Sequence, residues 1–149
     1  MTSASIYKHS TPFQLDCGNQ LPEMEIAYHT FGDLNQSKDN VVLICHPLTG
    51  DSNAKEWWPK VVGPGLAIDT NQYYVICTNS LGGCQGSTGP KSINPKTNEP
   101  YLIDFPIITI SDMVRAQRCL FEHLNITHIK MVIGGSMGGM QALEWVVQA

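Results

Sequence analysis

Long apolar runs are missing from this sequence of 149 residues. No segment approaches the roughly 20 consecutive apolar residues that a membrane-spanning helix needs. Residues 1–10 are polar and lack the apolar centre of a secretion signal. Charge of one sign is also sparse: the formal net charge is −4, and no basic stripe of the kind that binds nucleic acid is visible. We therefore expect a cytoplasmic protein that binds neither membranes nor nucleic acid.

Paired cysteines are absent as well. The five cysteines are far apart and none belongs to a C-x-x-C pair, which argues against a disulfide framework and against a structural zinc site. Free thiols in a reducing compartment are the expected state, and we expect no metal site. Cys45 and Cys77 lie in apolar runs and should pack in the core. Cys84 lies in a glycine-rich loop and is the one thiol to test for reactivity.

Short apolar runs are present at residues 41–45, 73–77 and 129–133. Continuous apolar runs of this length are typical of strands buried on both faces. Residues 113–124 follow a mostly apolar period of 3.6 residues, which predicts a helix, and a second helix should begin near Met137. Buried strands that alternate with helices predict an α/β fold with a mainly parallel sheet.

The ends of these elements carry signals of their own. Residues 109–112 (Thr-Ile-Ser-Asp) resemble a capping box, which marks the start of a helix. Towards the N-terminus, residues 13–16 and 24–31 are expected to form an antiparallel pair of strands, with turn chemistry at Gly18-Asn19 between them. Residues 79–106 form a long segment rich in glycine, proline, serine and asparagine. A loop of that length is usually functional or disordered, and its place after a strand favours function.

A serine between glycines is the strongest chemical signal. Residues 134–139 (Gly-Gly-Ser-Met-Gly-Gly) match the pattern G-x-S-x-G, with an apolar strand before it and an amphipathic segment after it. Strand, sharp turn and helix form the context in which this motif presents a nucleophile, here Ser136. The alternatives are a serine that merely caps the helix and a dinucleotide-binding turn. The second needs the spacing G-x-G-x-x-G, which is not present.

Residues 46–50 (His-Pro-Leu-Thr-Gly) follow the strand at 41–45 and are expected to complete an oxyanion hole. One donor in such sites is the backbone N–H of the residue after the nucleophile, here Met137, and the other comes from the loop after an earlier strand. Pro47 has no N–H, so Leu48 is the expected second donor. The His46 side chain is expected to be structural, because it precedes the serine in the chain and a general base must reach the nucleophile.

Seven segments together resemble the homoserine O-acyltransferases of methionine biosynthesis. They are residues 46–51, 57–58, 63–65 with 67–70, 79 with 81–84, 86–90, 110–117 and 134–145. The resemblance covers nearly the whole chain, with one departure: the family usually has alanine at the position of Pro47. It implies an α/β-hydrolase fold of which residues 1–149 are the N-terminal part of a single domain. The catalytic Asp, the catalytic His, the lid and an arginine for the homoserine carboxylate are then expected beyond this chain.

The same resemblance implies ping-pong transfer of an acetyl group from acetyl-CoA to L-homoserine through an acyl-serine at Ser136, in a homodimeric enzyme. Acetyl-CoA is then a co-substrate, and no permanently bound cofactor is expected. Two other readings stay open at this point: a serine esterase on the same fold, and an inactive truncated fragment. The sequence does not choose between acetyl and succinyl donors, nor between homoserine and serine as acceptor.

Overall fold

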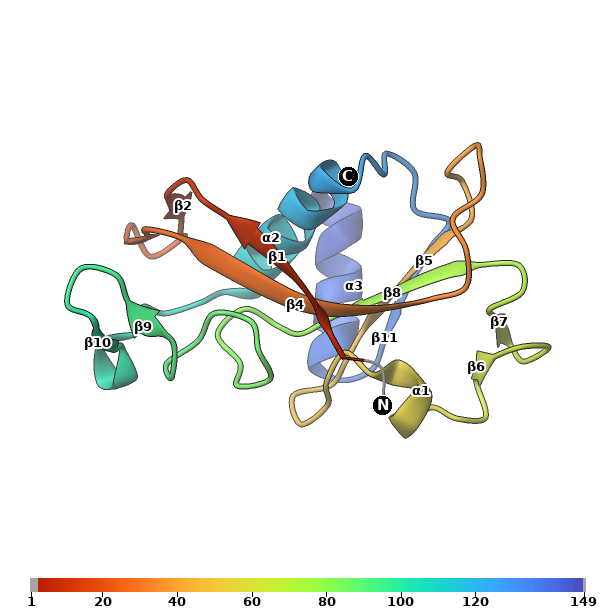
Figure 1. Cartoon of the computed structure of the whole chain (residues 1–149), viewed down its shortest axis with the longest axis horizontal. Helices are drawn as coiled ribbons and strands as arrows, with labels where there is room; N and C mark the ends of the chain where they lie inside the picture. Colours follow the sequence, from red (N-terminus) through yellow and green to blue (C-terminus); the bar gives the residue numbers. More distant parts are fainter. Residues whose placement is uncertain (1–2, 149) are drawn as a thin grey trace.

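A five-stranded sheet in the order β1-β4-β8-β5-β11 forms the centre of the computed structural model, which describes residues 3–148 (Figure 1). The strands are Ser5–His9 (β1), Met24–Phe31 (β4), Tyr74–Thr78 (β8), Val41–Cys45 (β5) and Met131–Gly134 (β11). Strand β4 is antiparallel to both β1 and β8, whereas β5 is parallel to both β8 and β11. Four strands therefore point the same way and only β4 opposes them, which confirms the mainly parallel sheet.

The central strand β5 is buried along its whole length. Its odd-numbered residues, among them Leu43, pack with Phe121 on the helical side of the sheet. Its even-numbered residues, among them Ile44, pack with Val62 and Ile68 on the opposite side. Because side chains alternate between the two faces of a strand, burial on both faces requires the unbroken apolar run that the sequence shows.

Two helices, Ile110–His123 (α2) and Met137–Gln148 (α3), contact each other and lie against the sheet (Figure 1). The predicted capping box at the start of α2 is confirmed. The Thr109 hydroxyl accepts from the Asp112 N–H at 3.0 Å, and the Asp112 carboxylate accepts from the Thr109 N–H at 2.9 Å. Two of the orphan donors of the first helical turn are thereby satisfied.

Asp112 also connects α2 to the N-terminal segment. Its fully buried carboxylate accepts from the Asp16 N–H at 3.0 Å and pairs with the Arg115 guanidinium. Arg115 pairs in turn with the Asp16 carboxylate. A hydrogen bond from the Thr109 hydroxyl, and after it the Arg115 guanidinium, lower the pKa of Asp16 below its usual range.

The N-terminal pairing differs from the prediction. Strand β4 pairs with β1, in the register that places Tyr7 opposite Ile26. Residues 13–14 instead form a short hairpin with residues 20–21, and Gly18 stands in its turn with a φ of 86°. Strand β1 was missed because it is an edge strand in which Tyr7 is the one buried residue, so it carries no apolar alternation.

The connections contain shorter elements. Between β5 and β8 lie Ala54–Trp57 (α1), Val62–Gly63 (β6) and Ile68–Asp69 (β7). The segment 79–106 is mostly irregular and includes Ile93–Asn94 (β9), Glu99–Pro100 (β10) and the 3-10 turn Leu102–Asp104 (η1). Within residues 3–148, no helix combines the length and the apolar character required to cross a membrane.

Candidate active site

The predicted serine elbow is a two-residue connection. Strand β11 ends at Gly134 and α3 begins at Met137, so only Gly135 and Ser136 lie between them. Ser136 has a φ of 56° and is exposed. A residue other than glycine in this left-handed region carries a strain of about 1–3 kcal/mol, a pattern common at functional sites. The structure therefore presents the Ser136 hydroxyl at the surface on a strained turn.

Glycine is required around this turn for reasons of space. A Cβ atom at Gly138 would lie 2.0 Å from the carbonyl oxygen of Cys45, and one at Gly134 would lie 2.3 Å from the carbonyl oxygen of Gly138. Both obstacles are main-chain atoms that cannot rotate away. Helix α3 thus approaches the ends of β5 and β11 so closely that no side chain fits between them.

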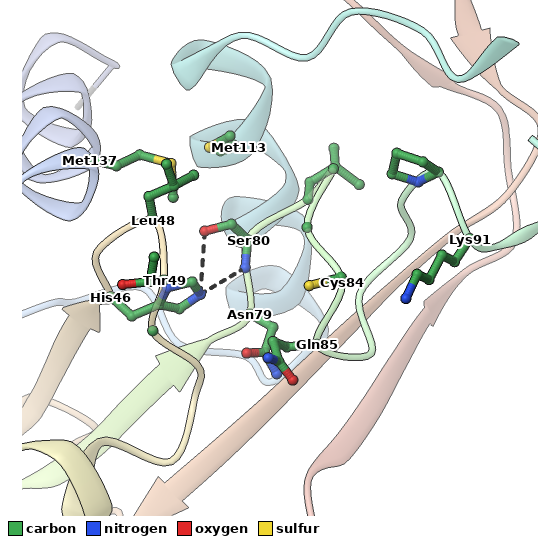
Figure 2. A pocket seen from close by; sticks show the side chains of 15 residues that line it. His46, Leu48, Thr49, Asn79, Ser80, Cys84, Gln85, Lys91, Met113 and Met137 are labelled. Atoms are coloured by element: carbon green, nitrogen blue, oxygen red, sulfur yellow. Dashed lines mark hydrogen bonds between the residues drawn. The ribbon is translucent and has the colours of Figure 1, made fainter. Parts of the chain in front are cut away.

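The sheet register brings the elbow and residues 46–50, which we call the oxyanion loop, to the same end of the strands. Strands β5 and β11 are parallel, with Cys45 opposite Gly134. The chain leaves β5 into residues 46–50 and leaves β11 into Ser136, both from the same end of the sheet. In Figure 2 the side chains of Leu48 and Met137 lie next to each other above the loop that contains His46.

The loop itself is a tight turn in which the Gly50 N–H donates to the Pro47 carbonyl at 2.8 Å. Leu48 stands near its tip and is 75% exposed. The backbone N–H groups of Leu48 and Met137 have no hydrogen-bond acceptor among residues 3–148. Two main-chain donors without an internal acceptor at one end of the sheet are what an oxyanion hole requires.

His46 is buried, and both of its ring nitrogens have partners. Nε2 accepts from the Ser80 N–H at 3.1 Å, and Nδ1 lies 2.7 Å from the Pro47 carbonyl oxygen. Because Nε2 accepts from a backbone donor, the proton must reside on Nδ1, which donates to Pro47. This imidazole therefore has no free nitrogen for Ser136 and holds the loop instead, in agreement with the structural role predicted for it.

A cavity of about 500 Å³ opens beside these two loops. Its lining combines residues from the oxyanion loop, the segment after β8, and the two helices (Figure 2). The side chains labelled there are His46, Leu48, Thr49, Asn79, Ser80, Cys84, Gln85, Lys91, Met113 and Met137. Apolar side chains gather near Leu48 and Met137, and Lys91 lies at the other end of the lining.

The segment after β8 is attached to β4, which makes it a fixed wall. The Asn79 N–H donates to the Ala27 carbonyl at 2.8 Å, and the Ala27 N–H donates to the Ser87 hydroxyl at 3.0 Å. Further along, the Thr88 N–H donates to the Glu25 carbonyl at 2.9 Å. The prediction that residues 79–106 contribute to a site agrees with the cavity, which residues from 79 to 91 line.

The cysteines divide as the sequence suggested. Cys45 and Cys77 are buried, and burial raises the pKa of the Cys45 thiol to about 12 and that of Cys77 well above its usual value. Neither thiol is therefore suited to act as a nucleophile, since the thiolate is the reactive form. Cys84 is exposed and lines the cavity. No cluster of metal-ligating side chains occurs in the part of the chain that the structure describes.

Sequence reasoning missed a buried polar group behind the elbow. Gln117 on α2 and Gln141 on α3 are buried and hydrogen-bonded to each other at 2.7 Å. The available signal was Gln117 itself, a polar residue in the otherwise apolar stripe of its helix. Buried amides need partners, so a glutamine at such a position indicates a network that the pattern alone does not complete.

Comparison with known proteins agrees with this geometry. Residues 40–149 match the family described as alpha/beta hydrolase fold. Among curated proteins, the chain is 53% identical to the homoserine O-acetyltransferase of Methanosphaera stadtmanae over 97% of its length, and 53% identical to that of Pasteurella multocida over 91% of its length. It covers 31% and 40% of those two proteins, so it spans about a third of the length of these relatives.

Solved structures give the same picture. The homoserine O-acetyltransferase from Bacillus anthracis superimposes with a TM-score of 0.87 at 38% identity, covering 99% of this chain and 44% of that one. Esterase E22 superimposes with a TM-score of 0.89 at 37% identity, covering 97% of this chain and 44% of that one. The chain therefore belongs to the α/β-hydrolase fold family, and over nearly its whole length it is similar to homoserine O-acetyltransferases.

Proposed function

We propose that the full-length protein transfers an acetyl group from acetyl-CoA to the hydroxyl of L-homoserine, with Ser136 as the nucleophile. One observation carries the proposal. The exposed Ser136 stands on a left-handed turn at the carboxyl ends of β5 and β11, where the backbone N–H groups of Leu48 and Met137 have no hydrogen-bond acceptor among residues 3–148. The similarity to homoserine O-acetyltransferases supports the choice of donor and acceptor.

In the first half-reaction, Ser136 Oγ attacks the thioester carbon of acetyl-CoA and gives its proton to a histidine expected downstream of this chain. The carbonyl oxygen becomes an oxyanion that accepts from the Leu48 and Met137 N–H groups. Each such donor typically contributes about 3–4 kcal/mol to the transition state. The C–S bond then breaks, CoA leaves with the proton, and an acetyl ester remains on Ser136.

In the second half-reaction, the homoserine hydroxyl loses its proton to the same base and attacks the ester carbon. The second oxyanion occupies the same two amides, the bond to Ser136 Oγ breaks, and the serine regains its proton. Transfer requires that water be excluded while the ester persists. The fixed wall formed by the segment after β8, together with the apolar side chains near Leu48, serves that purpose on this side of the site.

Charge in the cavity favours an anionic donor. Lys91 lines it at the end away from Leu48 and Met137, and no aspartate or glutamate lines it. Among residues 3–148 the Lys91 ammonium has no ion-pair or hydrogen-bond partner. A phosphate of CoA would pair with this ammonium while the thioester reaches Ser136.

We place the enzyme in the cytoplasm, because free cysteines are typical of proteins in a reducing compartment.

The test uses the full-length protein and follows CoA release with a thiol reagent, with and without homoserine. We expect release to depend on homoserine and to fall at least about a thousandfold in Ser136→Ala, while the exposed Ser10→Ala retains full activity. Without homoserine, mass spectrometry should find one acetyl group on the peptide containing Ser136. Succinyl-CoA and serine, offered in place of the proposed substrates, identify the donor and acceptor.

A serine esterase is the second candidate, and the close superposition on esterase E22 favours it. The two functions share Ser136 and the oxyanion hole and differ in which nucleophile receives the acyl group. Equal CoA release with and without homoserine, with acetate as the product, would show the esterase to be the correct assignment.

A further inference from the structure

A continuous chain of buried hydrogen bonds joins helix α3 to the oxyanion loop. Gln141 lies one helical turn after Met137 and is fully buried. Its side-chain amide donates to the Ser80 hydroxyl at 3.4 Å. The Ser80 N–H donates to His46 Nε2 at 3.1 Å, as Figure 2 shows. His46 Nδ1 reaches the Pro47 carbonyl at 2.7 Å. The path therefore begins beside one proposed oxyanion donor and ends beside the other.

The orientation of the Gln141 amide is fixed from its other side. Trp145 Nε1 can only donate, and it donates to Gln117 Oε1 at 2.6 Å. Gln117 Nε2 must then be the end that donates to Thr78 Oγ1 at 3.1 Å and to Gln141 Oε1 at 2.7 Å. With its oxygen occupied by Gln117, Gln141 is left with its NH₂ group towards Ser80. Neither the Gln117 nor the Gln141 amide can flip without leaving a buried polar atom unpaired.

The hydrogen bond from the Ser80 N–H to Nε2 fixes the His46 tautomer, and this tautomer in turn holds the loop at residues 46–50 in place. The proton on Nδ1 ties the imidazole to the Pro47 carbonyl, which also accepts from the Gly50 N–H and so closes the turn that carries Leu48. The Leu48 side chain is largely exposed, so burial does little to set its position. The direction of its N–H therefore depends on the atoms that hold the turn from below.

We propose that Gln141 is a positioning residue: through Ser80 and His46 it fixes the Leu48 turn relative to the first turn of α3, so that the Leu48 and Met137 amides converge on one oxyanion. This inference rests on the proposed function only in assuming that an oxyanion forms there; acyl transfer and ester hydrolysis require it equally. Two donors supplied by separate segments give full stabilisation only if their separation is held constant.

The decisive variant is Gln141→Met in the full-length protein, because methionine fills a similar volume without donors or acceptors. We expect kcat to fall on the order of 10–100-fold, part of the loss for a deleted oxyanion donor, with KM changed less than about twofold. The loss should be similar with acetyl-CoA and with p-nitrophenyl acetate, since both pass through the same oxyanion. Assays run well below the unfolding temperature separate this effect from lost stability.

A matched control is available on the same helix. Gln148 also bonds to α2, through Ser111 Oγ at 3.1 Å, but belongs to no path that reaches His46. Gln148→Met should leave kcat unchanged. Ser80→Ala, which removes the hydroxyl and keeps the N–H that His46 needs, should lower kcat in the same direction as Gln141→Met by a smaller factor. It serves as the test if Gln141→Met does not fold.

A second readout does not depend on the reaction. In protein labelled with ¹⁵N-histidine, the signal of His46, assigned by its loss in His46→Asn, should show a protonated Nδ1 and an unprotonated Nε2, and should shift in Gln141→Met. Unchanged kcat in the folded variant, or an unchanged His46 signal, overturns the positioning role. If instead the wild-type protein transfers no acetyl group while the His46 signal behaves as expected, the proposed function fails and the network stands.

Discussion

The close approach of α3 to β5 makes Gly138→Ala the sharpest test of the elbow. The new Cβ would lie 2.0 Å from the Cys45 carbonyl oxygen, and Cβ contacts under 3.0 Å are essentially never seen. The helix and the strand would therefore have to separate by about 1 Å. Both atoms in conflict are near the main chain, so no side-chain rotation relieves the contact.

The expected magnitude combines two opposing effects. Overpacking of this kind typically destabilises by about 1–3 kcal/mol, occasionally more, and a main-chain obstacle places this case at the upper end. Alanine in place of glycine within a helix recovers about 1 kcal/mol. We therefore expect a net loss of about 2 kcal/mol in the free energy of unfolding. A displacement of about 1 Å between the elbow and the oxyanion loop should also reduce kcat on the order of a hundredfold.

Urea unfolding of the full-length protein, followed by tryptophan fluorescence, measures the first effect. The matched control is Gly135→Ala, because a Cβ at Gly135 meets nothing within 4 Å; its stability should change by less than about 0.5 kcal/mol. Gly139, whose Cβ would lie 3.3 Å from the Gly134 carbonyl oxygen, should fall between the two. Equal stability of the Gly138 and Gly135 variants would refute the packing argument.

Three further outcomes follow from the structure. In the native protein at pH 8, iodoacetamide should label Cys84 rapidly, whereas Cys45 and Cys77 should react only after unfolding, as read by peptide mapping; early labelling of the buried pair contradicts their assignment to the core. The lowered pKa of Asp16 means that the unfolded state binds its proton first as the pH falls. Its stabilising contribution is then complete above the usual carboxyl pKa of 3.8 and is lost below it, so Asp16→Asn should flatten the acid limb of stability against pH. Lys91→Gln should raise the KM for acetyl-CoA by up to about fivefold, the limit for an exposed charge pair, and leave p-nitrophenyl acetate hydrolysis unchanged; an equal effect on both substrates argues against a phosphate contact.

Much of the architecture was already determined by local sequence signals. The unbroken apolar run of β5 predicted burial on both faces, and the capping box of α2 predicted where that helix starts. Both signals depend on neighbouring residues alone. The elbow was predictable for the same reason: its strand, its turn and its helix are consecutive. The oxyanion role of residues 46–50 was predicted from their place after the strand at 41–45, and the family resemblance then added the substrates expected for the whole protein.

What the sequence could not supply was the pairing of distant segments. Strand β1 pairs with β4 although only Tyr7 marks it as a strand, and an edge strand needs no apolar pattern since one side faces solvent.

The network from Trp145 to Pro47 likewise joins four separate parts of the chain: the loop after β5, the end of β8 with the segment that follows it, α2 and α3. The residue types were visible, but which donor meets which acceptor is decided only when the helices pack on the sheet. Hydrogen bonds depend on distance and angle across that packing. The strand-turn-helix elbow at Ser136 could therefore be predicted from the sequence, whereas the hydrogen-bond network beneath the proposed oxyanion donors could be found only in three dimensions.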